Sequence, residues 1–572
     1  MKLFRRLFWM LTAVSVFALS SCSDDDDEDG GADFGQPTIS VTAGASTPQQ
    51  APGKVVTLSI AVTSESGLAS VKLNDEVIKT YNGEKSATFN HDYTVPATTP
   101  SGTDLKLTLI VTDNQATAQT ATSSITIKVT TNPKETVVIE GKVTTSATWS
   151  ASKYYVLKGN VFVQSGVELT IEPGTVIFGD KDTKGSLIID RGAKIHAVGT
   201  PEKPIIFTSQ GGVGFRDYSD WGGVILLGKA VNNQSTDQKI EGISATTGQN
   251  GLYGGSADND NSGEFQYVRI EFGGIALSTD NEINGLTMGS VGSATKLDHV
   301  QVSFSGDDSF EWFGGTVNAK YLVSYSGWDD DLDTDFGYTG KVQYVAVMRD
   351  PNLADKSGSN AFESDNEGNA RDITPYTAPV FSNVTVFGPH VYAALSSGAL
   401  SGSAISGNFQ NGAHIRRRSA MKLYNSAIVG FSSSFYAFNF LDSKGSGSAL
   451  ADVKNNYIAR VASGKVTNPE SGVATGGGYD VTGFATNNTI EASGVTKVDI
   501  SGVFTGLTGA ADITKPADNF VPAANSILLT GAVTDVAAMG LEATTFKGAV
   551  ESAEKNWLKQ TWINFDPKHT SY

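Results

Sequence analysis

The chain has 572 residues, of which 39% are hydrophobic and 18% are charged, so it can form a core and is not a disordered polyelectrolyte. Its 62 glycines against six methionines, with frequent Thr, Ser and Val, favour many short strands and turns over helices. The net charge of −18 disfavours nucleic-acid binding, because an acidic surface repels a phosphate backbone. Cys22 is the only cysteine, which excludes an intrachain disulfide and a cysteine-rich zinc site.

Residues 1–21 have the pattern of a secretory signal peptide. A cationic start precedes an apolar run over residues 7–19, which is shorter than the roughly 20 residues that span a bilayer. The run ends in Leu-Ser-Ser-Cys, which resembles the bacterial lipobox, so we expect Cys22 to be lipidated and to tether the protein to a membrane. An ordinary signal peptide with an incidental cysteine is the alternative.

Residues 22–36 are predicted to form an acidic tether. Six consecutive carboxylates, at positions 24–29, are too hydrophilic to pack on a core. Such a run directly after the cysteine resembles the export signal of surface lipoproteins of the Bacteroidota. This resemblance implies an outer-membrane lipoprotein that faces the outside of the cell. A plain spacer, with the protein left in the periplasm, is the alternative.

Residues 37–131 are predicted to form a β-sandwich of the immunoglobulin type. Several alternating apolar runs lie in this stretch, and turn residues such as Asn74 and Asp75 separate some of them. The segment has no cysteine pair and no polar cluster that suggests catalysis, so a stalk is the favoured role and ligand binding is the alternative. The apolar runs are 38–41, 55–62, 68–73, 105–111 and 125–129.

Residues 137–460 are predicted to form a β-solenoid. Short apolar strands recur between Gly- and Asn-rich turns at a period of roughly 20–25 residues, which is typical of stacked coils. The Glu-Pro-Gly-Thr turn at 172–175 and the stretch at 199–208 resemble the opening coils of right-handed parallel β-helix proteins. A propeller is the alternative, but no blade signature is present. The expected fold class is therefore all-β: a sandwich followed by a right-handed parallel β-helix.

Residues 461–572 are predicted to be an irregular β flank followed by an aromatic cap. The pattern weakens over residues 462–520, which are rich in Gly, Ser, Thr and Asn. Aromatic side chains are dense over residues 556–565, close to the C-terminus. Such density suggests a cap over the last open coil of the solenoid.

Three segments of the solenoid, 307–315, 329–337 and 359–366, align with one another. The step from the first copy to the second fits one coil, and the longer step to the third fits a coil that carries an insertion. If the matched apolar residues point into the solenoid, the alternation of a strand directs the matched acids outward. The apolar residues are Phe310, Leu332 and Phe362, and the acids are Glu311, Asp333, Asp335, Glu363 and Asp365.

These stacked acids are predicted metal ligands. Neighbouring strands lie about 4.8 Å apart, so carboxylates in register repel one another. A bound cation, a basic side chain or a raised pKa relieves that repulsion. Oxygen ligands favour Ca²⁺ over zinc or copper, so Ca²⁺ is the expected cofactor. An acidic face that is paired with basic residues or merely solvated is the main alternative, and catalytic carboxylates are the other.

Four further residues are predicted to contact a ligand. In a strand, Arg416 and Arg418 would share one face and Arg417 the other, so one side could neutralise the acids or hold an anionic group of the ligand. Trp328, in a predicted loop before three aspartates that include Asp331, is the aromatic residue best placed to meet a sugar ring. We therefore expect Trp328, Asp331, Arg416 and Arg418 to contribute to ligand binding.

The stretch Trp-Gly-Gly-Val-Ile at 221–225, with segments 307–315 and 329–337, resembles surface lipoproteins of the Bacteroidota that carry a pectate-lyase-like right-handed β-helix. This resemblance implies a partnership with a TonB-dependent transporter. Its likeness to polysaccharide lyases implies calcium-binding acids beside an Arg or Lys base. The first hypothesis is a non-catalytic surface protein that binds a glycan or another nutrient, assisted by calcium. The alternatives are a lyase or glycoside hydrolase, and an adhesin or structural surface protein.

Overall fold

The structure is a computed structural model. The predicted signal peptide, Cys22 and residues 23–34 of the acidic tether lie outside its described residues. No helix within the described part of the chain is long and apolar enough to span a bilayer. The described residues are 35–44, 48–131, 133–244, 248, 250–278, 281–392, 405–431, 435–440, 451–468, 479, 481–491, 499–509, 511–512 and 514–572.

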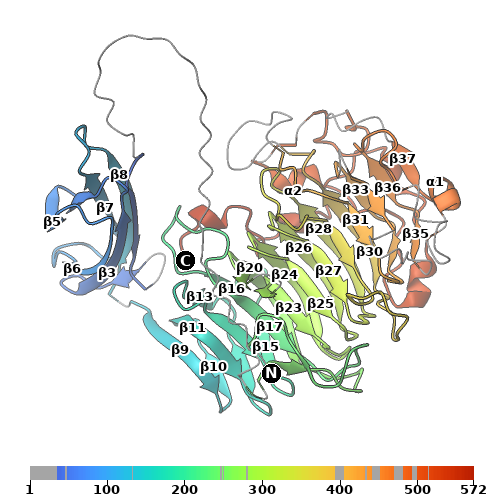
Figure 1. Ribbon diagram of the computed structural model, residues 1–572, viewed down its shortest axis with the longest axis horizontal. Coiled ribbons are helices and arrows are strands. Elements are labelled where there is room, and N and C mark those ends of the chain that lie inside the picture. The colour runs from blue at the N-terminus through green and yellow to red at the C-terminus, as the bar shows by residue number, and fades with distance from the viewer. Residues whose placement is uncertain are drawn as a thin grey trace, which may run out of the picture.

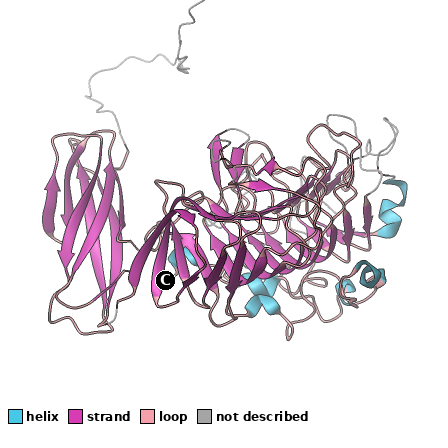
Figure 2. Cartoon of the chain, turned by 90° about the horizontal axis from the view of Figure 1, so that it is seen from below, coloured by secondary structure: helices cyan, strands magenta, loops and turns pink. Residues whose placement is uncertain are grey.

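The N-terminal unit consists of two β-sheets around one core, and it stands beside the first coils of the larger unit (Figures 1 and 2). Apolar residues of both sheets alternate with exposed ones and pack into this shared core. The two-sheet unit agrees with the expected sandwich, whereas its immunoglobulin type stays a prediction. One sheet holds β1 (Thr38–Thr42), β3 (Val55–Thr63) and β6 (Ser86–Thr94). The other holds β2 (Gln49–Gln50), β8 (Thr120–Val129), β7 (Asp104–Asp113), β4 (Leu68–Leu73) and β5 (Glu76–Thr80).

The larger unit is a parallel β-helix whose 25 strands form one sheet. Its first strands are β9 (Glu135–Val143), β10 (Ala147–Trp149), β11 (Lys153–Val163), β12 (Glu168–Ile171), β13 (Val176–Gly179), β14 (Ser186–Ile189), β15 (Lys194–Val198), β16 (Ile205–Ser209), β17 (Gly223–Leu227), β20 (Gly263–Glu271), β23 (Leu286–Gly289) and β24 (Lys296–Ser303). Then follow β25 (Phe310–Phe313), β26 (Asn318–Tyr325), β27 (Leu332–Asp335), β28 (Lys341–Met348), β29 (Phe362–Ser364), β30 (Val380–Phe387), β31 (Ala413–Ile415), β32 (Lys422–Tyr424), β33 (Ala427–Val429), β34 (Phe438–Asn439), β35 (Asp452–Lys454), β36 (Tyr457–Ala459) and β37 (Thr489–Glu491).

Two small hairpins and short helices complete the described chain. The solenoid runs past residue 460, where the sequence placed its end, because β37 adds a strand after a Gly- and Thr-rich segment that lacks the apolar alternation. The hairpins are β18 (Gln238–Lys239) with β19 (Leu252–Tyr253), and β21 (Ile275–Ser278) with β22 (Asn281–Ile283). The helices are α1 (Phe484–Asn487), α2 (Pro516–Asn519) and the 3₁₀ turns Val481–Gly483, Ile527–Leu529, Asp535–Met539, Trp557–Lys559 and Pro567–His569.

The register of the coils places equivalent residues directly above one another. Phe310 pairs with Leu332, which pairs with Phe362, and all three side chains are fully buried in the solenoid core. The predicted alignment of the three segments, with its apolar residues inside, is therefore confirmed. The acids one residue later stack in the same register on the outer face of the strands.

A ladder of polar side chains joins consecutive coils at the turn before these strands. The carboxylate of Asp308 accepts the backbone N–H of Asp330 (2.8 Å), and that of Asp330 accepts the N–H of Asn360. Asn360 and Asn411 continue the pattern, since the side chain of Asn360 accepts the N–H of Asn411 (2.9 Å) and that of Asn411 accepts the N–H of Tyr436 (3.2 Å). These four side chains satisfy buried backbone groups that the parallel sheet leaves unpaired at its corner.

The C-terminal segment does not cap the last coil, as the sequence suggested, but runs back along one flank of the solenoid. Asn425 donates to Val533, Gln343 to Glu542 and Gln301 to Asn564, so later residues meet progressively earlier coils. The chain ends beside the first coils, near β13 and β16 (Figure 1), where the backbone oxygen of Tyr572 accepts from the hydroxyl of Tyr154 (3.1 Å). We call residues 514–572 the C-terminal strap. Its aromatic rings pack on a lengthwise row of tyrosines and phenylalanines rather than on the open end.

Replacing Asn360 with alanine is expected to destabilise the solenoid by about 1–3 kcal/mol, because the buried N–H of Asn411 loses its acceptor. The matched change is Asn82→Ala, at an exposed position of the sandwich, where a shift within about 0.5 kcal/mol is expected. Guanidinium unfolding followed by circular dichroism measures both. Equal effects of the two substitutions would show that the ladder contributes no stability.

Candidate acidic site

A cavity of about 430 Å³ lies over the outer face of β25, β27 and β29. We call it the acidic cavity, because carboxylates far outnumber cations along its wall. The strands supply the middle of the wall, the turns before them supply adjacent aspartates, and the insertions near residues 241, 282 and 355 supply the rest. Its carboxylates are Glu241, Glu282, Asp307, Asp308, Glu311, Asp329, Asp330, Asp333, Asp355 and Glu363, and its cations are Lys356 and Arg416.

Asp333 lies at the centre of the acidic cavity. It pairs in register with Glu311 on one side and Glu363 on the other. Oxygen atoms of Asp333, Glu311 and Asp308 lie within 4.8 Å of one another, and so do those of Asp333, Glu363 and Asp330. Asp307, Asp308 and Asp329 form a third group of this kind. The three overlapping groups bring several oxygen donors within the reach of one or two cations.

Two oxygens of this cluster are buried without a hydrogen-bond partner. They are one carboxylate oxygen of Asp329 and one of Asp333. Glu311, by contrast, accepts a hydrogen bond from the side-chain amide of Asn284, and Asp308 and Asp330 serve the ladder of backbone N–H groups. A buried carboxylate oxygen without a donor is unfavourable, so these two atoms fit a site for a cation.

Burial raises the pKa values of these acids, and their mutual repulsion adds to the effect. The pKa of Asp333 rises to about 7, where Arg416 partly opposes the effect of burial. The pKa of Glu241 rises to about 8, through burial and the nearby Glu282. Burial and the adjacent carboxylates also hold the pKa of Glu311 well above its usual value. The cluster therefore retains protons near neutral pH unless a positive charge displaces them.

Three of the five predicted metal ligands, Glu311, Asp333 and Glu363, line the acidic cavity, whereas Asp335 and Asp365 lie beyond its wall. Asp365 is ion-paired with Arg416 (2.9 Å) and Arg417 (2.6 Å). Asp335 accepts the N–H of the next residue, Phe336 (2.6 Å). Their role as ligands stays a prediction. The aspartates at 307, 308, 329 and 330 stood in the aligned segments, but nothing periodic in the sequence marked Glu241, Glu282 or Asp355.

The expected alternation of Arg416, Arg417 and Arg418 is wrong, because β31 ends at Ile415 and the chain turns there with positive φ angles at 417 and 418. Arg416 forms an ion pair with Glu363 as well as with Asp365, so it neutralises one end of the acidic row. Arg418 lies at the surface, 3.5 Å from Asp372, and does not line the cavity.

Asp331 lies inside the solenoid, so its predicted contact with a ligand is wrong. Its side chain is fully buried, 3.2 Å from the guanidinium of Arg349 and 2.5 Å from the hydroxyl of Ser324. It lies in the turn before β27, where the alternation of a strand does not apply, and the turn directs its side chain inward. Trp328 is half-buried, as a loop residue can be, and lines a second cavity rather than the acidic one.

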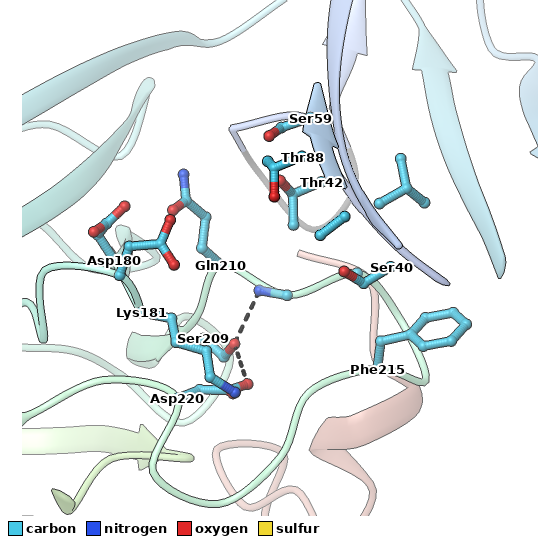
Figure 3. A pocket seen from close by; sticks show the side chains of 15 residues that line it. Ser40, Thr42, Ser59, Thr88, Asp180, Lys181, Ser209, Gln210, Phe215 and Asp220 are labelled. Carbon is cyan, nitrogen blue, oxygen red and sulfur yellow. Dashed lines mark hydrogen bonds and ion pairs between the residues drawn. The ribbon is translucent and has the colours of Figure 1, made fainter. Parts of the chain in front are cut away.

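A third hollow, of about 250 Å³, lies between the sandwich and the first coils (Figure 3). Ser40, Thr42 and other small polar residues form its sandwich side. On the solenoid side Asp220 pairs with Lys181 (2.8 Å) and accepts from Ser209 (2.6 Å), as Figure 3 shows in part. These charges satisfy one another, which is typical of an interface between units.

In the presence of EDTA, the protein is expected to lose stability as the pH rises from about 4 to about 8. Carboxyls with a folded-state pKa of about 7 at Asp333 and about 8 at Glu241 bind more protons in the native state than in the unfolded chain. The free energy of unfolding therefore falls as those protons are lost. Scanning calorimetry across this range measures the trend. Asp333→Asn should flatten it, and a profile that rises through the window would contradict the assignment.

Comparison with known proteins identifies the family to which the fold belongs. The family described as pectate-lyase like beta helix domain matches residues 141–499, which is more than half of the chain. No curated protein matches the sequence. Two solved structures of the catalytic domain of a GH87 alpha-1,3-glucanase, both variants in complex with tetrasaccharides, match with 11% and 12% identity and TM-scores of 0.22 and 0.20. Each match covers 80% of this chain and 98% of that domain. At these TM-scores the likeness says nothing about function. The family match agrees with the parallel sheet of stacked coils, and the protein belongs to the pectate-lyase-like β-helix family.

Proposed function

We propose that this protein is a surface lipoprotein that binds a glycan with the help of a divalent cation held in the acidic cavity. Ca²⁺ is the preferred candidate for this cation. The observation that carries the proposal is the pair of buried, unpartnered oxygens on Asp329 and Asp333, each within a group of three carboxylates. Such oxygens have no favourable state at neutral pH except beside a cation or a proton.

Basic side chains do not remove the need for a cation. Arg416 neutralises the end of the row at Glu363, which leaves Glu311 and Asp333 beside further acids. Ten carboxylates line the cavity against two cationic side chains, Lys356 and Arg416. The excess negative charge favours uptake of cations from solution and disfavours a free anionic ligand.

The donor set selects the metal. Carboxylate and amide oxygens line the cavity, the amides coming from Asn284 and Gln410, and hard cations prefer such ligands. Ca²⁺ accepts six to eight oxygens in flexible geometry, which suits a row of acids on adjacent strands. When bound, the cation supplies positive charge that hydroxyl or carboxylate oxygens of a glycan can approach.

The cellular location of the protein is part of this proposal. The lipobox-like sequence at Cys22 and the acidic run at 24–29 support a lipid anchor in the outer membrane and display on the cell surface. A surface lipoprotein that holds a glycan would pass it to a TonB-dependent transporter, which is the proposed partner. Nucleic acid is an unsuitable ligand for this cavity, because both carry negative charge.

A carbohydrate-active enzyme is the second candidate. The observation that favours it is the pKa of about 7 at Asp333, which keeps that carboxyl partly protonated at neutral pH, as a general acid requires. A neighbouring ionised acid would then be the base or nucleophile. An enzyme of this kind would release new reducing ends or unsaturated products from the glycan, and Asp333→Asn would abolish the release while the protein stays folded.

Calcium is expected to bind the full-length protein in detergent and to raise its melting temperature. At a free concentration 100 times the Kd, binding stabilises the folded state by about 2.7 kcal/mol. Glu311→Gln and Asp333→Asn should each weaken calcium binding at least tenfold in isothermal titration calorimetry. Glu65→Gln, at an exposed acid of the sandwich, is the matched control. Equal binding by all three variants would refute the assignment of the metal to the acidic cavity.

Native affinity electrophoresis through gels that contain different glycans tests the ligand. Retardation by one glycan that is stronger in Ca²⁺ than in EDTA, with the protein folded in both, is the expected result. Glu311→Gln should lose the calcium-dependent part of the retardation, and Glu65→Gln should keep it. Retardation that is equal in EDTA would contradict a role for the cation, and binding to cells but to no glycan would favour an adhesin.

A further inference from the structure

A second cavity, of about 890 Å³, lies on the flank that the C-terminal strap covers. We call it the aromatic cavity. The turns after β20 and β24 contribute Phe272 and Phe304, and Tyr325 at the end of β26 continues their row. The strap forms another wall through Asn564 to His569. The volume falls within the range of about 300–1,000 Å³ that is typical of small-molecule sites.

The rings of this cavity leave part of their surface open. Tyr218, Phe304, Trp328 and Phe565 are all half-buried. Tyr218 meets both Trp328 and Phe304 edge to face, with ring centroids 5.3 and 5.4 Å apart. Phe565 of the strap stands perpendicular to Tyr325, with centroids 5.2 Å apart. The edge-to-face contacts fix these rings at angles to one another, so they wall a hollow instead of filling it.

Two polar atoms of the lining are buried without a hydrogen-bond partner, the hydroxyl of Tyr218 and one guanidinium nitrogen of Arg216. The hydroxyl of Tyr218 is buried and makes no hydrogen bond with any described residue. A buried hydroxyl without a partner costs free energy, which a ligand that offers a donor or acceptor would recover. The cavity therefore combines open aromatic faces with one unsatisfied hydroxyl.

The charges of the lining point to a neutral ligand. Asp217, Asp350 and Asp566 are opposed by the cations Arg216 and Lys568, and His569 lies beside them. Arg216 donates to the backbone oxygens of Gly211 and Pro567, and His569 lies 2.7 Å from Asp566. The aromatic cavity thus lacks the single-sign field of the acidic cavity and does not select an ion.

We propose that the aromatic cavity binds a neutral pyranose unit of a glycan, packed against Trp328 and hydrogen-bonded to the hydroxyl of Tyr218, without a metal. A pyranose has an apolar face of C–H groups that packs on aromatic rings and an edge of hydroxyls that form hydrogen bonds. This site is separate from the acidic cavity and stands even if that cavity holds no cation. Trp328 and Asp329 are consecutive, so one extended glycan can lie near both cavities.

The test uses the full-length protein in detergent with EDTA, so that the acidic cavity holds no metal. Cellohexaose, xylohexaose, mannohexaose and laminarihexaose are the probes, and tryptophan fluorescence and titration calorimetry are the readouts. At least one probe should bind with a saturable fluorescence change. Glu311→Gln should bind it like the unmodified protein, since the acidic cavity is not involved.

Two substitutions in the cavity test the placement. Trp328→Ala should weaken binding of that probe at least tenfold, and Tyr218→Phe, which removes only the hydroxyl, should weaken it about threefold to tenfold. Phe215→Ala, at a ring that is 41% exposed and lies outside this cavity, is the matched control and should bind normally. Melting temperatures check folding, and if Trp328→Ala fails to fold, Tyr218→Phe decides.

Three results would overturn the inference. The first is that no probe binds in EDTA. The second is that a probe binds only with Ca²⁺, which places it in the acidic cavity. The third is that Tyr218→Phe binds as tightly as Phe215→Ala. Loss of calcium binding alone would refute the proposed metal site and leave the aromatic cavity unaffected.

Discussion

The parallel register of the coils is the constraint on which the rest of this structure depends. Strands about 4.8 Å apart, in register, place each residue directly above its counterpart in the next coil. Phe310, Leu332 and Phe362 are superposed in this way, and they build a continuous core. The same register leaves no freedom to the outward residues, so Glu311, Asp333 and Glu363 must stack as well. The arrangement that stabilises the inside of the solenoid therefore concentrates negative charge on its outside.

That charge divides into two classes by what each carboxylate contacts. Asp308 and Asp330 accept backbone N–H groups of the following coil, at the position that asparagines occupy in the next two coils. Those aspartates stabilise the fold, and the side-chain oxygen of an asparagine could accept the same hydrogen bonds. Asp329 and Asp333 accept no such bond at one of their oxygens. The structure thus separates acids that hold the coils together from acids whose oxygens remain available to a cation.

The sequence predicted the features that follow from the repeat of one coil, and it did not predict those that lie where turns or insertions interrupt this repeat. The spacing from Phe310 to Leu332 sufficed to predict the stacked acids, because register follows from an apolar residue repeated once per coil. Asp331 was misplaced, since the turn before β27 fixes which aspartate of the run points inward, and composition cannot show that. Arg418 was misplaced because β31 ends at Ile415, before the chain reaches it.

The C-terminal strap and the walls of the acidic cavity were beyond prediction for a related reason. Glu241, Glu282 and Asp355 lie on insertions between coils, where no repeat fixes their position. The dense aromatics of the strap signalled a large apolar contact but not its direction. Their partners, such as Tyr321 and Tyr344, stack on one flank of the solenoid and come from coils far earlier in the chain.

Both cavities arise where the solenoid departs from its own repeat. A regular β-helix buries its core and presents flat flanks, which offer little concave surface for a ligand. Here insertions rise beside β25, β27 and β29 to enclose the acidic cavity, and the strap crosses the C-terminal ends of β24 and β26 to enclose the aromatic one. Trp328 and Asp329 link the two, because a single turn between β26 and β27 sends one side chain into each. The regular coils form a rigid frame, and the insertions and the strap contribute the side chains that enclose the two cavities.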